Sequence, residues 1–262
     1  MKIKVVGAAG GEVTGSGYLV ETARARVLVE CGIFQGGRAA EARNRAPIAP
    51  GQKLDAVLVT HAHLDHTGRL PMLVKTGYRG PVYMTSATAD LTALILRDSA
   101  KIQAQDAERQ NRKRQRAGKR FEEALYTPED AEAIIRRVAP VPYQKAVVVA
   151  PGVTACFAEA GHLLGSASIQ LVLEEDGKRK SVVFSGDLGP KGAPILRDYE
   201  PFHNADVVFE ESTYGDRDHR PFGETVREFD EIVADAVRQG GRILVPTFAV
   251  GRAQVMTMLL GE

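Results

Sequence analysis

Cysteine is scarce in this chain, which has only Cys31 and Cys156 in 262 residues. Two cysteines are too few for the disulfide framework of a small secreted domain. Both lie in apolar, strand-like stretches, so we expect two buried free thiols in a reducing compartment. No charged-then-apolar leader opens the chain, and no apolar run approaches membrane-spanning length. These absences argue against a secreted scaffold or a membrane protein and predict a cytoplasmic one.

An excess of one charge is also lacking, because 34 Lys and Arg face 33 Asp and Glu, a net charge of +1. The overall field therefore favours nucleic acid no more than any other partner. The stretch Lys101–Arg120 is an exception, with eight basic residues against two acidic ones. Such a run is usually a solvated helix face, and the alternative is a surface that contacts phosphates. It contains no aromatic residue, so base stacking is not predicted there.

The hydrophobic content of 44% is enough for one large or two smaller domains. Short β-branched or apolar runs predict strands, and an apolar stripe at helical spacing predicts a helix. Strands are expected over 3–7, 17–20, 26–31, 56–60, 82–85, 145–149, 153–158, 168–173, 181–184, 206–211 and 242–247, and helices over 87–110, 131–138, 224–237 and 249–260. Asp176-Gly177 predicts a hairpin turn, and Thr127-Pro128 predicts a helix start with proline at its first position. After residue 200 the pattern changes from hairpins to alternating strands and helices, which predicts a domain boundary near residues 200–208.

A cluster of metal-seeking side chains follows the apolar run 56–59. It consists of His61, His63, Asp65 and His66. In extended backbone, residues two apart point to the same side, so His61 and His63 are expected to converge. Asp65 and His66 stand where the chain turns into a predicted helix, so they can face a second point. The cluster therefore predicts ligands for two adjacent metals, zinc first, with manganese or iron as competitors.

Two later segments have the character of further ligands. His162 lies in a turn bracketed by glycines, and Asp187 lies at a predicted strand end between Gly186 and Gly189. Glycine lets backbone approach closely at such places. Each residue alone is more often structural, but together they could supply a third imidazole and a carboxylate that bridges both metals.

The order His-x-His-x-Asp-His, then Gly-His, then Ser-Gly-Asp resembles the metallo-β-lactamase superfamily. The segments Glu211-Ser-Thr-Tyr-Gly-Asp216 and Val245-Pro-Thr-Phe-Ala-Val-Gly-Arg252 resemble its β-CASP branch of RNA-processing nucleases. The basic run and Leu125–Asp130 look most like prokaryotic members of that branch. The resemblance implies an α/β (α+β) fold, an αββα sandwich over residues 1–207, lacking its C-terminal return segment. Residues 208–262 would begin an inserted β-CASP α/β domain.

The resemblance also implies roles for individual residues. His61, His63 and His162 would hold one zinc, Asp65 and His66 a second, and Asp187 would bridge the two. Asp65 would also orient the nucleophile. Glu211 would be a catalytic residue near the reacting phosphate, and the alternative is a carboxylate that caps a turn at a strand end.

The family pattern and this chain differ at two points. In the family, one downstream His protonates the leaving ribose oxygen and another completes the second metal site. His203 and His219 match neither motif and are expected in surface loops, so we expect the chain to be a fragment rather than a naturally short homologue. The family also usually has Asp at Glu30, where the carboxylate braces the metal loops. The extra methylene can shift that brace, and errors of this kind cost 10–100-fold in metal affinity or activity.

The leading hypothesis is a ribonuclease with two Zn²⁺ ions that hydrolyses RNA phosphodiester bonds through a hydroxide held between the metals. An inactive or impaired RNA-binding homologue is the second hypothesis, and a small-molecule hydrolase of the same fold is the third. The expected partner is RNA, in single-stranded form, with contacts along Lys101–Arg120 as an option and no membrane. The RNA target, the endo- or exonucleolytic mode and the oligomeric state, a homodimer included, stay open.

Overall fold

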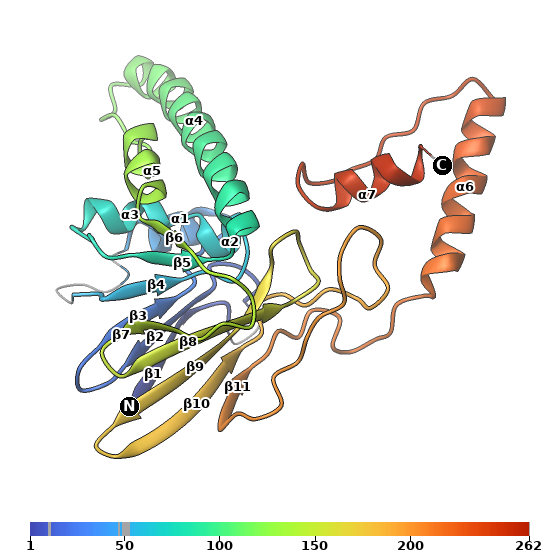
Figure 1. Ribbon diagram of the computed structural model, residues 1–262. Helices are drawn as coiled ribbons and strands as arrows, with labels where there is room; N and C mark the ends of the chain where they lie inside the picture. The colour runs from blue at the N-terminus through green and yellow to red at the C-terminus, as the bar shows by residue number, and fades with distance from the viewer. Residues whose placement is uncertain (10–11, 47, 49–52, 262) are drawn as a thin grey trace. The chain divides into compact units, whose positions relative to one another are not determined.

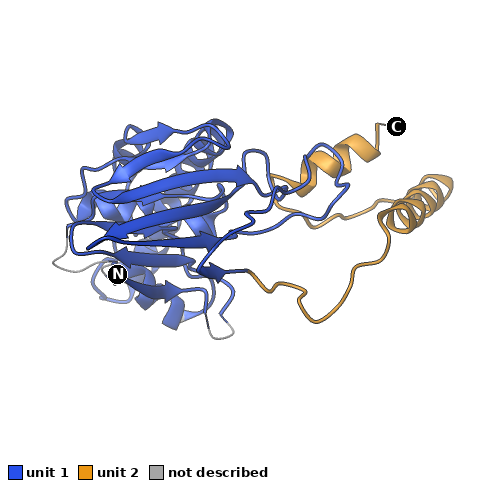
Figure 2. Ribbon diagram, turned by 60° about the horizontal axis from the view of Figure 1, so that its bottom comes forward, with its two compact units in different colours: residues 1–210 blue, residues 211–262 orange. Residues whose placement is uncertain are grey.

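The computed structural model describes residues 1–9, 12–46, 48 and 53–261 (Figure 1). Its contacts divide the chain into two compact units, residues 1–210 and 211–262, which Figure 2 draws in blue and orange. The expected boundary between residues 207 and 208 falls inside a strand that pairs with the first unit. Whether the two units are the two domains that the sequence suggests stays a prediction.

The first sheet has six strands in chain order: β1 (Lys2–Gly7), β2 (Gly17–Glu21), β3 (Arg26–Val29), β4 (Ala56–Leu58), β5 (Val82–Met84) and β6 (Val138–Pro140). The strands β1, β2 and β3 are antiparallel, and β3 through β6 run parallel. Parallel neighbours need a crossover, and helices provide it here. The carboxyl ends of β3 and β4 therefore meet at the same edge of the sheet.

The second sheet has five strands in the order β11-β10-β9-β8-β7. They are β7 (Val147–Ala150), β8 (Val153–Glu159), β9 (Ala167–Glu175), β10 (Lys178–Phe184) and β11 (Val207–Phe209). Asp176 and Gly177 form the tight turn between β9 and β10, both with positive φ, as the Asp-Gly signal predicts. β11 alone pairs in parallel, with β10.

Two apolar cores organise the first unit. One lies between the sheets and includes Val29, Leu58, Phe157, Ile169 and Phe184. The other lies between the six-stranded sheet and the helices on its outer side. These helices are α1 (Arg38–Arg45), α2 (Leu64–Thr67), α3 (Leu70–Lys75), α4 (Ser86–Arg116) and α5 (Pro128–Ile135). The layered arrangement of helices and two facing sheets confirms the predicted α/β fold class.

The helices follow the predicted signals with shifted ends. At Thr127 the side chain accepts from the Asp130 N–H while the Asp130 carboxylate accepts from the Thr127 N–H, which is the predicted helix start in capping-box form. α4 continues six residues beyond the expected end at residue 110, since its polar outer half contains no helix breaker. β6 was not expected and takes the place of the end of the predicted helix over 131–138.

The second unit contains α6 (Phe222–Arg238) and α7 (Arg252–Leu259), neither with a buried residue. The strand predicted over 242–247 is wrong, because that segment pairs with no strand among the described residues. Its apolar sequence favours a strand, but a strand forms only beside a partner.

The two thiols are free, as predicted, but only Cys31 is buried, while Cys156 is half-buried. Burial raises the pKa of Cys31 to about 12, so this thiol is inert at neutral pH. Among the described residues, no helix combines the length and the apolar character that a bilayer span requires.

Candidate metal centre

The predicted ligands lie in loops and in one short helix at one end of the sandwich. β4 leads into His61 and His63, and α2 carries Asp65 and His66. His162 follows β8, and Asp187 follows β10. Loops from both sheets thus meet at this end, which brings residues about a hundred positions apart into contact.

Backbone hydrogen bonds fix the segment after β3 against α2. Cys31 N–H donates to the His66 carbonyl at 2.8 Å, and Ile33 N–H donates to the Leu64 carbonyl at 2.9 Å. Between them, a Cβ on Gly32 would lie 1.5 Å from the Asp65 carbonyl oxygen. Only glycine permits this close approach, which sets the position of α2 and of the two ligands it carries.

Four nitrogen and oxygen donors converge at the first set. Nδ1 of His63 lies 3.1 Å from Nε2 of His61 and 3.2 Å from Nε2 of His162. Oδ2 of Asp187 lies 3.6 Å from Nε2 of His61 and 3.5 Å from Nε2 of His162. Donors bound tetrahedrally at about 2.0–2.1 Å from one ion lie about 3.3 Å from each other. The donors therefore have the spacing of a tetrahedral metal site, and the expected convergence of His61 and His63 is confirmed.

A second set lies on the other side of Asp187. Its Oδ1 is 3.3 Å from Nε2 of His66, and Oδ2 of Asp65 is 3.7 Å from the same nitrogen. The two oxygens of one carboxylate thus face two different groups of donors. A carboxylate placed in this way has an oxygen available for each group, and the bridging role of Asp187 stays a prediction.

Glu30 is only 1% exposed, and its carboxylate contacts both His66 of the second set and the backbone next to His61 of the first set. The Nδ1–H of His66 donates to Oε2 of Glu30, and the backbone N–H of Thr60 donates to Oε1 at 2.7 Å. Because a carboxylate only accepts, the proton of a neutral His66 ring stays on Nδ1 and leaves Nε2 free as a ligand. The longer Glu side chain therefore does reach the metal loop, despite the shift that its extra methylene could cause.

Thr60 is a residue that the sequence did not single out. Its Oγ1 lies 3.0 Å from Nδ1 of His61, so Nδ1–H can donate there while Nε2 faces the other donors. Gly186, with φ +59°, packs against the Thr60 side chain and would place a Cβ 2.7 Å from it. A threonine at a strand end is too common for the sequence to predict this contact.

The electrostatics of the cluster favour neutral imidazoles in the first set. Burial, followed by the neighbouring imidazoles, holds the pKa of His61 well below its ordinary value, and burial and His162 lower the pKa of His63. Burial also opposes the charge on His66, but Glu30 and Asp187 outweigh it and raise its pKa well above the ordinary value. Burial would raise the pKa of Asp187, yet His66 lowers it, so Asp187 is a carboxylate. Neutral imidazole and carboxylate are the ligating forms.

Glu211 is the first residue of the second unit. Its Oε2 accepts from the Thr213 N–H at 3.2 Å, which is the turn-capping role. A role near a phosphate stays a prediction. His203 and His219 are exposed, as expected for surface loops. The basic stretch 101–120 forms the outer half of α4 and the turn that follows it.

The model of the metallo-beta-lactamase superfamily matches residues 10–246. The chain belongs to the metallo-β-lactamase superfamily. This confirms the superfamily resemblance drawn from the His and Asp motifs, and the converging imidazoles and carboxylates of this superfamily member form a cluster that could bind a metal ion.

Several characterised proteins resemble this superfamily member along nearly its whole length. It is 43% identical over 261 residues to "Ribonuclease TTHA0252" of Thermus thermophilus, covering 99% of this chain and 54% of that protein. It is 34% identical to "Transcription termination factor FttA" of Methanocaldococcus jannaschii, over 96% of this chain and 38% of that protein. It is 32% identical to "Cleavage and polyadenylation specificity factor 73" of Drosophila melanogaster, over 100% of this chain and 36% of that protein. The chain thus spans about half or less of the length of these relatives.

Proposed function

We propose that this chain carries the metal centre of a zinc-dependent ribonuclease of the β-CASP type, which hydrolyses phosphodiester bonds in single-stranded RNA. The observation that carries the proposal is the Asp187 carboxylate, whose two oxygens face two groups of donors. The similarity to a protein named ribonuclease, at 43% identity, supports RNA as the substrate. The tetrahedral spacing of imidazole nitrogens supports zinc.

In this proposal His61, His63 and His162 hold the first ion, and Asp65 and His66 hold the second, with Asp187 between them. When bound, a metal pair of this kind acidifies water and neutralises charge on the phosphate. Asp65 is half-exposed beside His66, so its free oxygen can also orient the attacking water. Glu30 and Thr60 fix the tautomers of His66 and His61.

Metal content tests the first part of the proposal. The purified chain, loaded with zinc and then dialysed, should retain about two zinc ions per molecule by mass spectrometry. Asp187→Asn should lower that number and weaken both sites, because its amide nitrogen cannot replace a carboxylate oxygen. His203→Ala, a change in an exposed histidine outside the cluster, should leave the zinc content unchanged. A wild-type chain without zinc would refute the metal site.

Hydrolysis tests the second part. The chain should cleave a labelled single-stranded RNA faster than a duplex RNA, and it should be slow on a thioester and on a lactone. Asp65→Asn and Asp187→Asn should abolish the cleavage, and His203→Ala should keep it. Zinc binding with hydrolysis of the lactone or thioester alone would favour a small-molecule hydrolase. Zinc binding and RNA binding without hydrolysis would favour the inactive homologue.

A further inference from the structure

The outer half of α4 protrudes from the first unit. The buried residues of this 31-residue helix are Thr88, Thr92, Leu96, Ser99 and Ala100, all in its first half. From residue 101 to residue 116 no side chain is buried, and Figure 1 shows this end extending past α5. A helical extension of this kind adds little to the core, so its sequence is free to serve another purpose.

The end of the helix is nevertheless an ordered structure. The Asn111 side chain donates to the Glu122 carbonyl and accepts from the Glu122 N–H, each at 2.8 Å. The Arg114 guanidinium donates to the Arg120 carbonyl at 2.5 Å and pairs with the Glu122 carboxylate at 2.9 Å. These contacts fold the turn after α4 back along the helix and bring Lys119 and Arg120 beside its last residues.

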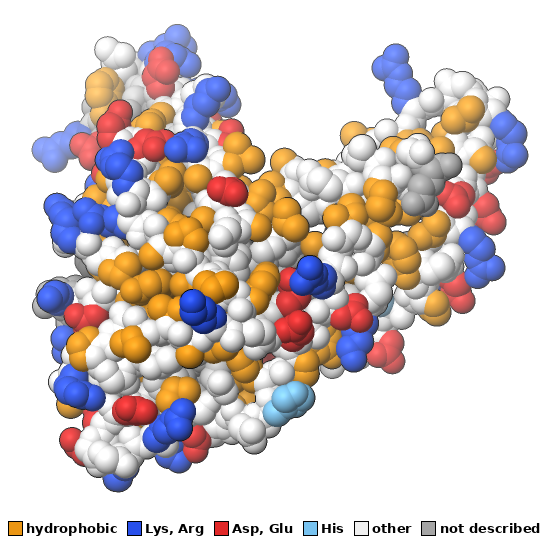
Figure 3. All heavy atoms as spheres, in the orientation of Figure 1, with side chains coloured by type: hydrophobic (Ala, Val, Ile, Leu, Met, Phe, Trp, Pro, Cys, Tyr) orange, Lys and Arg blue, Asp and Glu red, His pale blue; other side chains and the backbone are white. Residues whose placement is uncertain are grey.

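Ion pairs neutralise only part of the positive charge. Arg112 pairs with Glu108, and Arg109 and Arg114 have acidic partners too. Among the described residues no ion pair is found for the other cations of the stretch, which are Lys101, Lys113, Arg116, Lys119 and Arg120. Cations in the last turn also stabilise the helix dipole, but that effect fades beyond the turn and leaves Lys119 and Arg120 unexplained. Figure 3 shows Lys and Arg side chains at this end, with acidic and apolar side chains among them.

The helix also fixes the distance from this charge to the metal centre. At its start, Thr85 Oγ1 and Thr88 Oγ1 donate to the Gly165 carbonyl at 2.6 and 2.8 Å. Gly165 belongs to the same short loop as the candidate ligand His162. With a rise of 1.5 Å per residue, Lys113 and Arg116 lie about 40 and 45 Å along the helix from Ser86.

We propose that the outer end of α4, residues 113–120, is a phosphate-contacting anchor for RNA, remote from the metal centre. The inference rests on the proposed function, because it takes RNA as the ligand. The anchor lacks aromatic side chains and buried polar groups, so it binds backbone phosphates without regard to sequence. A stacked strand rises roughly 3.4 Å per nucleotide, so an RNA of about 12–13 nucleotides spans the distance from centre to anchor.

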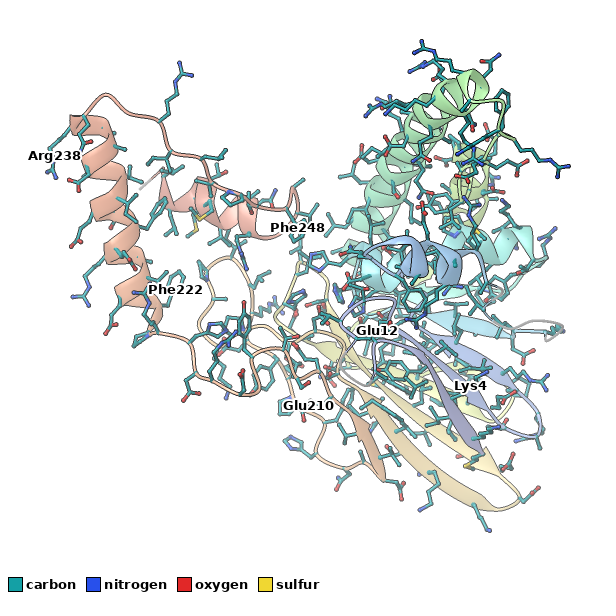
Figure 4. All side chains as sticks on the ribbon, turned by 180° about the vertical axis from the view of Figure 1, so that it is seen from behind. Lys4, Glu12, Glu210, Phe222, Arg238 and Phe248 are labelled. Carbon is teal, nitrogen blue, oxygen red and sulfur yellow. The ribbon has the colours of Figure 1, made fainter. Side chains whose placement is uncertain are left out.

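The test measures binding without cleavage, in EDTA, by the fluorescence anisotropy of a labelled 30-nucleotide and a labelled 5-nucleotide RNA. The variant combines Lys113→Gln, Arg116→Gln, Lys119→Gln and Arg120→Gln, which keep helix propensity and leave the structural Arg114 intact. Its matched control neutralises four exposed lysines elsewhere in the first unit, namely Lys2, Lys4, Lys145 and Lys178. Lys4 lies on β1, on the sheet side of the molecule away from α4 (Figure 4). Circular dichroism establishes that both variants fold.

Four phosphate contacts contribute about 2.8 to the slope of log affinity against log salt for a single strand. Between 50 and 200 mM salt the wild type should therefore lose about 50-fold more affinity for the 30-mer than the anchor variant does. The control should behave as the wild type, and the 5-mer should bind all three proteins alike.

An unchanged salt slope in the anchor variant would overturn the proposal. It would also be overturned if the salt slope of the control variant fell as much as that of the anchor variant, or if the anchor substitutions weakened binding of the 5-mer as much as binding of the 30-mer. Tighter, anchor-dependent binding of polyglutamate than of RNA would also overturn it, since the surface would then prefer an acidic peptide. Failure of the proposed function is seen separately, because zinc content and cleavage of the 5-mer do not involve the anchor.

Discussion

Glu30→Gln is the substitution that examines the site most closely, because it changes one atom type and keeps the shape of the side chain. The Glu30 carboxylate accepts from His66 Nδ1–H with one oxygen and from the Thr60 N–H with the other. Glutamine has one carbonyl oxygen, so its NH₂ group must face one of these two donors. If the glutamine oxygen faces His66, the buried Thr60 N–H is left without an acceptor. If it faces Thr60, the NH₂ group meets Nδ1 of His66, whose proton must then move to Nε2, the nitrogen that faces the second set.

The magnitude follows from that lost hydrogen bond. A buried donor left without a partner costs about 1–3 kcal/mol, and Glu30 is 1% exposed, so water cannot replace the acceptor. His66 also loses the contact that keeps its proton on Nδ1. Loss of such a partner lowers metal affinity about 10–100-fold, or about 1.4–2.7 kcal/mol. We expect the second zinc to be affected more than the first, because His66 belongs to the second set.

Two measurements check this prediction: zinc titration against a chromophoric chelator, and urea unfolding in EDTA. Glu41→Gln, a change in an exposed glutamate on α1, is the matched control and should change neither quantity. The reasoning is refuted if Glu30→Gln binds both zincs as tightly as the wild type. Weaker zinc binding with unchanged stability in EDTA would show that the carboxylate orients His66 without contributing to folding.

Three further predictions concern other parts of the first unit. Gly32→Ala should displace α2, because its Cβ would meet the Asp65 carbonyl, and should abolish binding of the second zinc in the same titration; Gly223→Ala, with open space around it, should not. Thr127→Ala removes the cap of α5 and should cost about 1 kcal/mol in urea unfolding, and an unchanged midpoint would contradict the capping role. Zinc at about 100 times its dissociation constant should add about 2.7 kcal/mol and raise Tm by about 5–10 °C in calorimetry, whereas magnesium at the same concentration should not.

The strands and helices of the first unit were largely predictable, because each signal is local. Short β-branched or apolar runs predicted most strands, the Asp176-Gly177 turn predicted a hairpin, and Thr127 predicted a helix start. The predicted strand over 242–247 was wrong for the opposite reason. Its residues favour extended backbone, but whether they form a strand depends on a neighbour that local sequence does not specify.

The ligand types of the centre were also readable, since imidazoles and carboxylates are concentrated within a few positions from His61 to His66. The residues that orient these ligands could not be predicted in the same way. Thr60 contacts His61 and also packs against Gly186, a residue that follows a strand of the other sheet. Whether the longer Glu30 side chain can reach His66 and Thr60 depends on the distance between the segments that carry these residues, which the sequence does not give.

By itself, the sequence determined which groups are available: a cluster of metal ligands, two further candidates in glycine turns, and one basic stretch. The tertiary structure alone decided how they are used. It brought His162 and Asp187 to the cluster, with distances of 3.2–3.6 Å between their ligating atoms and the histidine nitrogens. It also directed the two oxygens of Asp187 toward different groups of histidines. It also placed the unpaired basic residues at the far end of a helix that begins beside the centre. The physical reason is that sequence fixes the chemistry of each side chain, while distance and burial arise only when distant segments pack.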